Sequence, residues 1–115
     1  MKKILIIDDE EMIVDVMKVI LEDLGHQVTG FHKSREGEKA AIENDYDLIL
    51  VDIRMPEKNG AEVTRSILKA KPEARILIIT AYPADPLVES ALNAGAMALM
   101  KKPFDMGKIL NFLKD

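Results

Sequence analysis

Apolar and polar residues follow one another along this chain in blocks. Short runs made wholly of apolar residues, such as Ile4–Ile7, Leu48–Val51 and Ile76–Ile79, recur between longer segments in which apolar residues return every three or four positions. An uninterrupted short apolar run favours a strand buried on both faces, and the longer spacing favours an amphipathic helix. The pattern predicts strands over residues 4–7, 27–31, 48–51, 76–79 and 97–101.

A helix is predicted after each strand. The first ends at Gly25, and its apolar face is expected to consist of Ile13, Val16, Met17, Ile20 and Leu24. Ser34, Asp85 and Asp105 are expected N-caps, because short polar side chains accept hydrogen bonds from the first free N–H groups of a helix. The later helices are predicted over residues 34 to 43 or 44, 61–70, 86 to 93 or 94, and 106–114.

The resulting order is five β-then-α units in a single domain, residues 1–115. Repeated units of this kind imply a parallel sheet with right-handed crossovers and helices on both faces, which is a doubly wound α/β fold. Residues 27–31 form the least apolar strand candidate, so we expect that strand at an edge of the sheet.

Composition narrows the function classes. The net charge of −4 and the sequence pI near 5.2 argue against a nucleic-acid-binding surface and against electrostatic attachment to an anionic membrane. The chain has no cysteine, which excludes disulfides and thiolate metal sites. No apolar run approaches the roughly 18 residues of a membrane span, and we expect a cytoplasmic protein.

Polar residues stand directly after four of the predicted strands. Asp8 and Asp9 follow the first strand, Asp52 the third, Thr80 the fourth and Lys102 the fifth. The carboxyl ends of parallel strands lie along one edge of the sheet, where open α/β sheets bind ligands. The sequence therefore predicts that these side chains meet at that edge. Glu10 and Glu11 are interpreted as acids at a helix start.

Three neighbouring carboxylates repel one another, and burial strengthens the repulsion. They stay ionised together when a cation lies among them, and all-oxygen ligands favour Mg²⁺. Magnesium held by carboxylates commonly serves phosphoryl chemistry, and Lys102 adds a second positive charge.

Five segments of the chain together resemble the receiver domain of two-component response regulators. The matching residues are Ile6–Glu10, Leu50–Pro56 with Gly60, Ile79–Ala81, Gly95-Ala96 and Lys102-Pro103-Phe104. The resemblance implies a flavodoxin-like sheet of strand order 2-1-3-4-5, for which a member of this same family is a standard example. It also implies a phosphoacceptor, a phosphoprotein carrying an aspartyl phosphate, and not a turnover enzyme.

The resemblance assigns a role to each site residue. Asp52 would be the phosphoacceptor, and Asp8, Asp9, Asp52 and the backbone carbonyl of Arg54 would hold Mg²⁺. Lys102 would pair with the phosphate, and Thr80 would be the switch hydroxyl. The Lys102-Pro103 bond is expected to be cis. The output face would consist of residues 86–94, 97–101 and 106–114.

One position departs from the family pattern. Leu99 stands where the family usually has an aromatic switch residue, three positions before the lysine. Tyr82 would either substitute for that residue or line the rim of the pocket, and the rim is the preferred interpretation. The alternative function is therefore a receiver-like interaction module with weak or atypical switching by phosphorylation. A flavin carrier is disfavoured because acids after the first strand would repel its phosphate.

The resemblance also implies partners. These are a sensor histidine kinase or a histidine phosphotransfer protein, and a downstream effector protein or a fused effector domain. No direct contact with nucleic acid or membrane is expected, and the protein would be a monomer or a phosphorylation-dependent dimer. The chain is expected either to act alone or to be the receiver part of a longer regulator.

Overall fold

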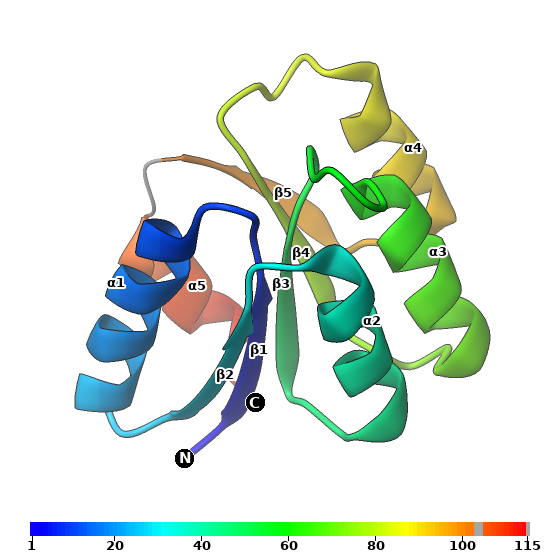
Figure 1. Cartoon of the computed structure of the whole chain (residues 1–115). Coiled ribbons are helices and arrows are strands. Elements are labelled where there is room, and N and C mark those ends of the chain that lie inside the picture. The colour runs from blue at the N-terminus through cyan, green and yellow to red at the C-terminus, as the bar shows by residue number, and fades with distance from the viewer. Residues whose placement is uncertain (103–104, 115) are drawn as a thin grey trace.

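One parallel sheet lies between two layers of helices in the computed structural model, which describes residues 1–102 and 105–114 (Figure 1). The strand order β2-β1-β3-β4-β5 and the parallel pairing confirm the predicted doubly wound fold and place β2 at an edge. The strands are β1 (Lys3–Ile7), β2 (Gln27–Phe31), β3 (Leu48–Asp52), β4 (Ile76–Thr80) and β5 (Ala98–Lys101). The helices are α1 (Glu11–Asp23), α2 (Ser34–Glu43), α3 (Gly60–Ala70), α4 (Pro86–Ala94) and α5 (Met106–Phe112).

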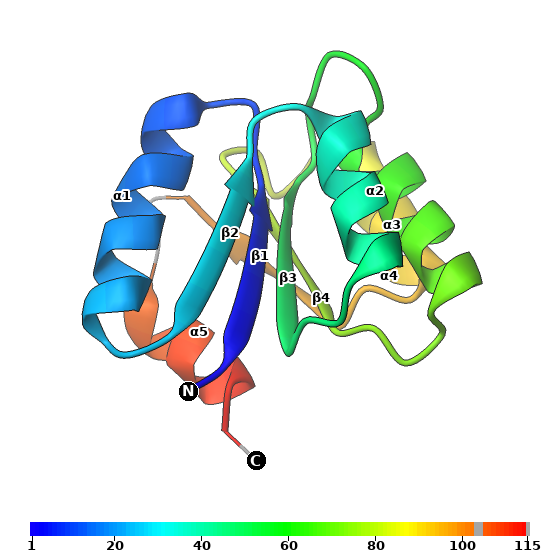
Figure 2. The same ribbon diagram turned by 60° about the horizontal axis from the view of Figure 1, so that its bottom comes forward.

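The sheet separates two hydrophobic cores. Helices α1 and α5 cover one face, and α2, α3 and α4 cover the other, as Figures 1 and 2 show. Successive residues of a strand point to opposite faces, so Leu48 and Leu50 join the core under α1 and α5, whereas Ile49 and Val51 join the other. This double burial explains why the central strands are uninterrupted apolar runs.

The predicted inner face of α1 was only partly right. Met17 is fully buried and Ile13 packs against the core, as predicted, but Val16, Ile20 and Leu24 are 40% to 50% exposed. The helix buries Val14 and Leu21 against the sheet instead. Apolar residues occur around most of this helix, so its spacing fits more than one rotation about the helix axis. The contact with the sheet selects one rotation and leaves a row of apolar side chains in solvent. That row consists of Met12, Val16, Val19, Ile20 and Leu24.

Two of the three predicted N-caps are confirmed. Asp85 caps α4 by accepting a hydrogen bond from the N–H of Leu87, and Asp105 caps α5 through Lys108. Ser34 is the first helical residue of α2 and not its cap. Its hydroxyl instead accepts from the backbone N–H of Lys58, which ties α2 to the loop after β3.

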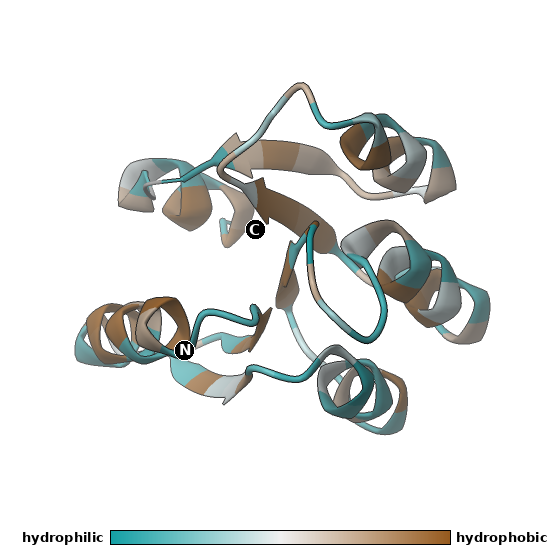
Figure 3. Ribbon diagram, turned by 45° about the horizontal axis from the view of Figure 1, so that its top comes forward, coloured by the Kyte–Doolittle hydropathy of each residue, from teal (hydrophilic) through white to brown (hydrophobic). Residues whose placement is uncertain are grey.

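Strand register aligns the polar residues at the carboxyl edge of the sheet. Ile7 of β1 lies opposite Val51 of β3, so Asp8 and Asp52 end neighbouring strands. Figure 3 turns this edge toward the viewer and shows hydrophobic strands capped by mostly hydrophilic loops. Pro103, with its predicted cis bond, lies outside the described residues. Within them, every helix is too short or too polar to cross a membrane.

Candidate functional site

Three carboxylates converge at the carboxyl edge of the sheet. Asp8 is fully buried directly after β1, Asp9 is exposed beside it, and Asp52 is the buried last residue of β3. One carboxylate oxygen of each lies within 4.8 Å of the others. The structure thus brings together the three acids that the sequence placed at two strand ends.

Backbone N–H groups orient two of these acids. The N–H of Glu10 donates to Oδ1 of Asp8 at 3.0 Å, and the N–H of Ile53 donates to Oδ1 of Asp52 at 2.9 Å. Each bond fixes one oxygen of its carboxylate. The buried Oδ2 of Asp8 contacts the ammonium of Lys102.

Lys102 supplies the positive charge of the site. Its Nζ lies 2.8 Å from Oδ2 of Asp8, 3.0 Å from Oε1 of Glu10 and 3.6 Å from Oδ1 of Asp52. Burial alone would lower the pKa of Lys102, but its hydrogen bond to Asp8 and the charges of Asp52 and Asp8 outweigh burial and raise that pKa. Lys102 therefore remains an ammonium ion at neutral pH.

Glu10 is a site residue that sequence reasoning assigned only to a helix start. It occupies the N-cap position of α1, where its side chain makes no capping hydrogen bond and instead contacts Lys102. The signal was its adjacency to Asp8 and Asp9, but the partner lies 92 positions away along the chain. Only the fold brings that partner into reach.

The surroundings of Asp52 disfavour its charged form. Burial, followed by the negative charge of Asp8, raises the pKa of Asp52 from 3.8 to about 8, against the opposing charge of Lys102. One lysine therefore does not neutralise the group of acids. An additional cation would restore the ionised carboxylate.

The donor set fits a hard divalent cation. Three carboxylates offer oxygen ligands only, and one lysine does not balance their charge. Mg²⁺ is commonly bound by one or two carboxylates with several waters retained. The residues present at this edge fit such an ion.

Thr80, the last residue of β4, and Tyr82, two residues after it, line the cavity beside the acids. Thr80 is buried, and its Oγ1 accepts a hydrogen bond from the backbone N–H of Tyr82 at 2.9 Å. The side chain of Tyr82 is 69% exposed and stands at the rim. Leu99 of β5 lies elsewhere, partly buried against the core beneath α2, α3 and α4.

Asp9, Asp52, Thr80 and Lys102 border one cavity of about 240 Å³. Arg54 lines it too, and its guanidinium pairs with Asp85, a contact that the sequence did not reveal. The full lining comprises Asp9, Glu10, Asp52, Ile53, Arg54, Thr80, Ala81, Tyr82 and Lys102.

Contacts within the loop after β3, and between this loop and α2, fix the loop beside the cavity. The N–H of Gly60 donates to the carbonyl oxygen of Ile53 at 2.8 Å, which folds the loop back on itself. A Cβ at residue 60 would lie 2.3 Å from the carbonyl oxygen of Asp52, so this position requires glycine. Lys58 fastens the loop to α2 through an ion pair with Glu38 at 2.5 Å.

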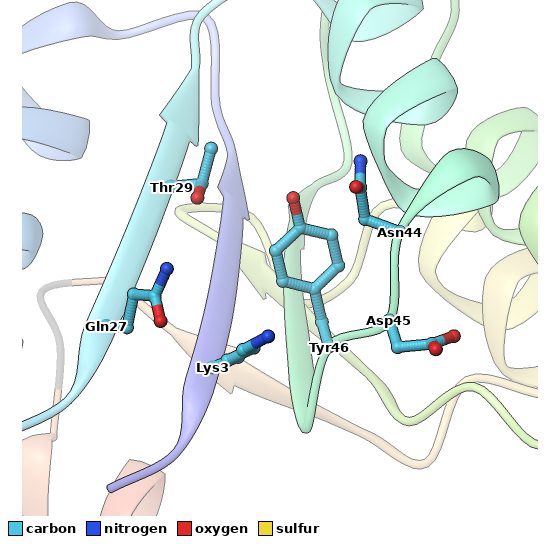
Figure 4. Close-up of a pocket in the computed structure, with 6 residues that line it drawn as sticks. All are labelled: Lys3, Gln27, Thr29, Asn44, Asp45 and Tyr46. Carbon is cyan, nitrogen blue, oxygen red and sulfur yellow. The ribbon is translucent and has the colours of Figure 1, made fainter.

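A second hollow, of about 200 Å³, lies near the amino ends of β1 and β2 (Figure 4). Its acid, Asp45, points away from the hollow and binds Lys71 at 2.7 Å, and that hydrogen bond lowers the pKa of Asp45. No group of acids gathers there among the described residues. The hollow in Figure 4 is lined by Lys3, Gln27, Thr29, Asn44, Asp45 and Tyr46. The cavity at the carboxyl edge is therefore the candidate site.

Fold and site together define a flavodoxin-like α/β domain with an acidic, lysine-bearing cavity at the carboxyl edge of its sheet. The family model described as "Response regulator receiver domain" matches residues 4–114. The chain belongs to this family, as the sequence motifs indicated. It is a two-component signalling domain and not a turnover enzyme.

Some curated relatives are about twice as long as this chain, and others have about the same length. The chain is 36% identical to the uncharacterized transcriptional regulatory protein YkoG of Bacillus subtilis over 93% of this chain and 47% of that protein. It is 32% identical to the chemotaxis protein CheY of Thermotoga maritima over 97% of this chain and 94% of that protein. The chain thus spans about half the length of the first relative and nearly all of the second.

Solved structures of relatives superpose closely. A CheY-like receiver domain protein from Methanospirillum hungatei JF-1 has a TM-score of 0.90 at 32% identity, over 96% of this chain and 89% of that one. The response regulator TrrA of Thermotoga maritima, in complex with Mg²⁺ and BeF, has a TM-score of 0.83 at 31% identity, over 98% and 100%. A Burkholderia pseudomallei response regulator with a phosphorylated aspartic acid has a TM-score of 0.88 at 29% identity, over 99% and 67%.

Proposed function

We propose that this chain is a phospho-accepting receiver of a two-component system in which Asp52 takes a phosphoryl group from a phosphohistidine. The observation that carries the proposal is the single cavity bordered by Asp52, two further acids, Lys102 and Thr80. The phosphorylated aspartic acid in the Burkholderia pseudomallei relative supports the same chemistry.

The transfer step is a displacement at phosphorus. A carboxylate oxygen of Asp52 attacks, the N–P bond of the phosphohistidine breaks, and the imidazole nitrogen leaves with the electron pair. With a proton on the second ring nitrogen of the phosphohistidine, the products are an aspartyl phosphate and a neutral histidine. The N–H of Ile53 binds Oδ1 of Asp52, and Oδ2 is the proposed attacking oxygen.

Asp8, Asp9, Asp52 and the backbone carbonyl of Arg54 are proposed to hold Mg²⁺. When bound, the ion would favour the ionised form of Asp52 and neutralise charge on the phosphoryl oxygens. Lys102 lies within 3.6 Å of Asp52 and offers its ammonium to the same oxygens. The TrrA relative, in complex with Mg²⁺ and BeF, supports this assignment.

Thr80 is proposed to pass the change to the output face. Its hydroxyl now accepts from the N–H of Tyr82, which fixes the start of the loop between β4 and α4. A dianionic phosphoryl group would attract the hydroxyl proton of Thr80 and alter that bond. The loop would then move, and with it the surface formed by α4, β5 and α5.

The partners that we propose are a histidine kinase or phosphotransfer protein and an effector, which is a separate protein or a fused domain. The exposed apolar row on α1 begins at Met12, three residues after Asp9, and exposed acids flank it at Asp15, Glu22 and Asp23. Such a row beside the cavity supports contact with a protein phosphodonor.

Leu99 favours the second candidate, an interaction module with atypical switching. Leucine cannot make the aromatic rotamer change of typical receivers, and Leu99 packs against the core beneath α4. In this candidate the surface is recognised without a strong response to phosphorylation.

Acetyl phosphate with Mg²⁺ tests the first candidate. Mass spectrometry should find one base-labile phosphoryl group on the parent chain and on the control Asp15→Asn, an exposed acid of α1. Asp52→Asn should carry none. Equal labelling of Asp52→Asn and the parent would refute the assignment. Absence of labelling on the parent would favour the second candidate.

A further inference from the structure

Arg54, which lines the cavity, forms a two-point ion pair with Asp85. Nε of Arg54 lies 2.6 Å from Oδ2 of Asp85, and Nη2 lies 2.9 Å from Oδ1. Both ends of the guanidinium fork are therefore engaged by one carboxylate, which is the strongest geometry for such a pair. The contact joins the loop after β3 to the start of α4.

Asp85 has a second role in this contact. Its Oδ1 also accepts from the N–H of Leu87, and its backbone carbonyl accepts from Val88, so it organises the first turn of α4. Its hydrogen bond to Arg54, followed by the one from Leu87, lowers the pKa of Asp85. The position of Arg54 is thus linked to the beginning of the helix that opens the proposed output face.

Arg54 also borders the cavity that contains Asp52, two residues earlier in the chain. Of the two cations that line this cavity, Lys102 is held by Asp8 and Glu10. The side chain of Arg54 is 62% exposed and that of Asp85 is 7% exposed. Arg54 is therefore the member of the pair with room to change its rotamer. A phosphoryl group on Asp52 would bring a second anion to which a guanidinium binds with both nitrogens.

We propose that Arg54 is a shared cation that is handed from Asp85 to the phosphoryl group when Asp52 is phosphorylated. The hand-over opens the Arg54–Asp85 pair and releases the first turn of α4. Because coupling between two sites is reciprocal, any change that weakens the pair strengthens the binding of an anion at Asp52. The inference rests on the proposed function and adds a path to α4 that does not require an aromatic residue at position 99.

The test measures the affinity of beryllofluoride, a stable substitute for the phosphoryl group, by calorimetry in the presence of Mg²⁺. Asp85→Asn removes the charge that holds Arg54 but keeps an oxygen for the N–H of Leu87, because asparagine is also a good N-cap. Arg54→Gln removes the shared cation. The double variant completes the cycle, and Asp45→Asn is the control, since it breaks a comparable exposed pair with Lys71 far from the cavity.

Asp85→Asn should bind beryllofluoride about two- to fivefold more tightly than the parent, the range expected for an exposed ion pair. Arg54→Gln should bind about three- to tenfold more weakly. Asp85→Asn should have no effect in the Arg54→Gln background, and Asp45→Asn should match the parent. Hydrogen exchange at the amides of Leu87 and Val88 should accelerate with beryllofluoride in the parent but not in Arg54→Gln.

Two failures are distinguishable. If the parent binds beryllofluoride but Asp85→Asn does not tighten binding, or tightens it equally without Arg54, the hand-over is refuted and the phosphoacceptor site stands. If the parent does not bind beryllofluoride at all, the proposed function fails and the hand-over fails with it.

Discussion

Replacing Asp52 by asparagine should stabilise the metal-free protein, and the gain should grow with pH. Burial and then the charge of Asp8 raise the pKa of Asp52 to about 8 in the folded chain, against 3.8 for an ordinary aspartate. A raised folded-state pKa contributes stability that is complete below the unfolded value and is lost as pH rises through the folded value. Asparagine keeps the acceptor for the N–H of Ile53 and has no charge to bury.

The magnitude follows from the two pKa values. At pH 7 the unfolded aspartate has been ionised over about three pH units while the folded one still holds its proton, and at about 1.4 kcal/mol per unit this gives about 4 kcal/mol. The open cavity of about 240 Å³ beside the carboxylate admits water, which screens its charge. We therefore expect a gain of about 2 kcal/mol.

Urea denaturation measures the difference. In EDTA the midpoints of parent and Asp52→Asn should nearly coincide at about pH 4 and should separate progressively up to about pH 8. Added Mg²⁺ should stabilise the parent more than the variant and narrow the gap, because ligands stabilise the state that binds them. If the difference between the two midpoints in EDTA stayed constant or shrank as pH rises, the pKa of Asp52 would not be raised in the folded chain.

Two further substitutions probe the framework by chemical denaturation. Thr64→Val should stabilise the protein by about 1 kcal/mol, because the buried Oγ1 of Thr64 has no hydrogen-bond partner among the described residues. A decrease in stability of about 1 kcal/mol would instead show that this hydroxyl makes a hydrogen bond. Gly60→Ala should destabilise it by about 2 kcal/mol and weaken Mg²⁺ binding, because the new Cβ would press on the backbone of Asp52 and Ile53. Gly107→Ala is the control, because its Cβ would meet only the side-chain Oδ1 of Asp105, at 3.3 Å. If Gly107→Ala destabilised the protein as much as Gly60→Ala does, the close contact at residue 60 would not be the cause.

Sequence predicted the fold because the central strands are buried on both faces. Runs such as Ile76–Ile79 have no other simple interpretation when helices follow them, and the ends of parallel strands must share an edge. The rotation of α1 could not be predicted in the same way, because apolar residues on several sides left the buried face ambiguous. Packing against the sheet, and not local spacing, decides which face is buried.

The polar contacts of the site were predicted unevenly for a related reason. Asp8, Asp9 and Asp52 were found because strand ends fix their positions. Glu10 and Asp85 were assigned local roles at helix starts, and Asp85 does cap α4. Their additional partners lie 92 and 31 positions away, at distances that depend on loop conformation and side-chain rotamers. Sequence patterns carry little information about either.

The division of the interior by the sheet has a consequence for how such a domain can diversify. Because neighbouring residues of β1, β3 and β4 supply different cores, α1 and α4 share almost no side-chain neighbours. Substitutions that remodel recognition at one helix leave the packing of the other untouched. The proposed donor-facing surface of α1 and the α4 part of the proposed output face can therefore change separately during evolution. Helix α5 cannot, because it shares its core with α1.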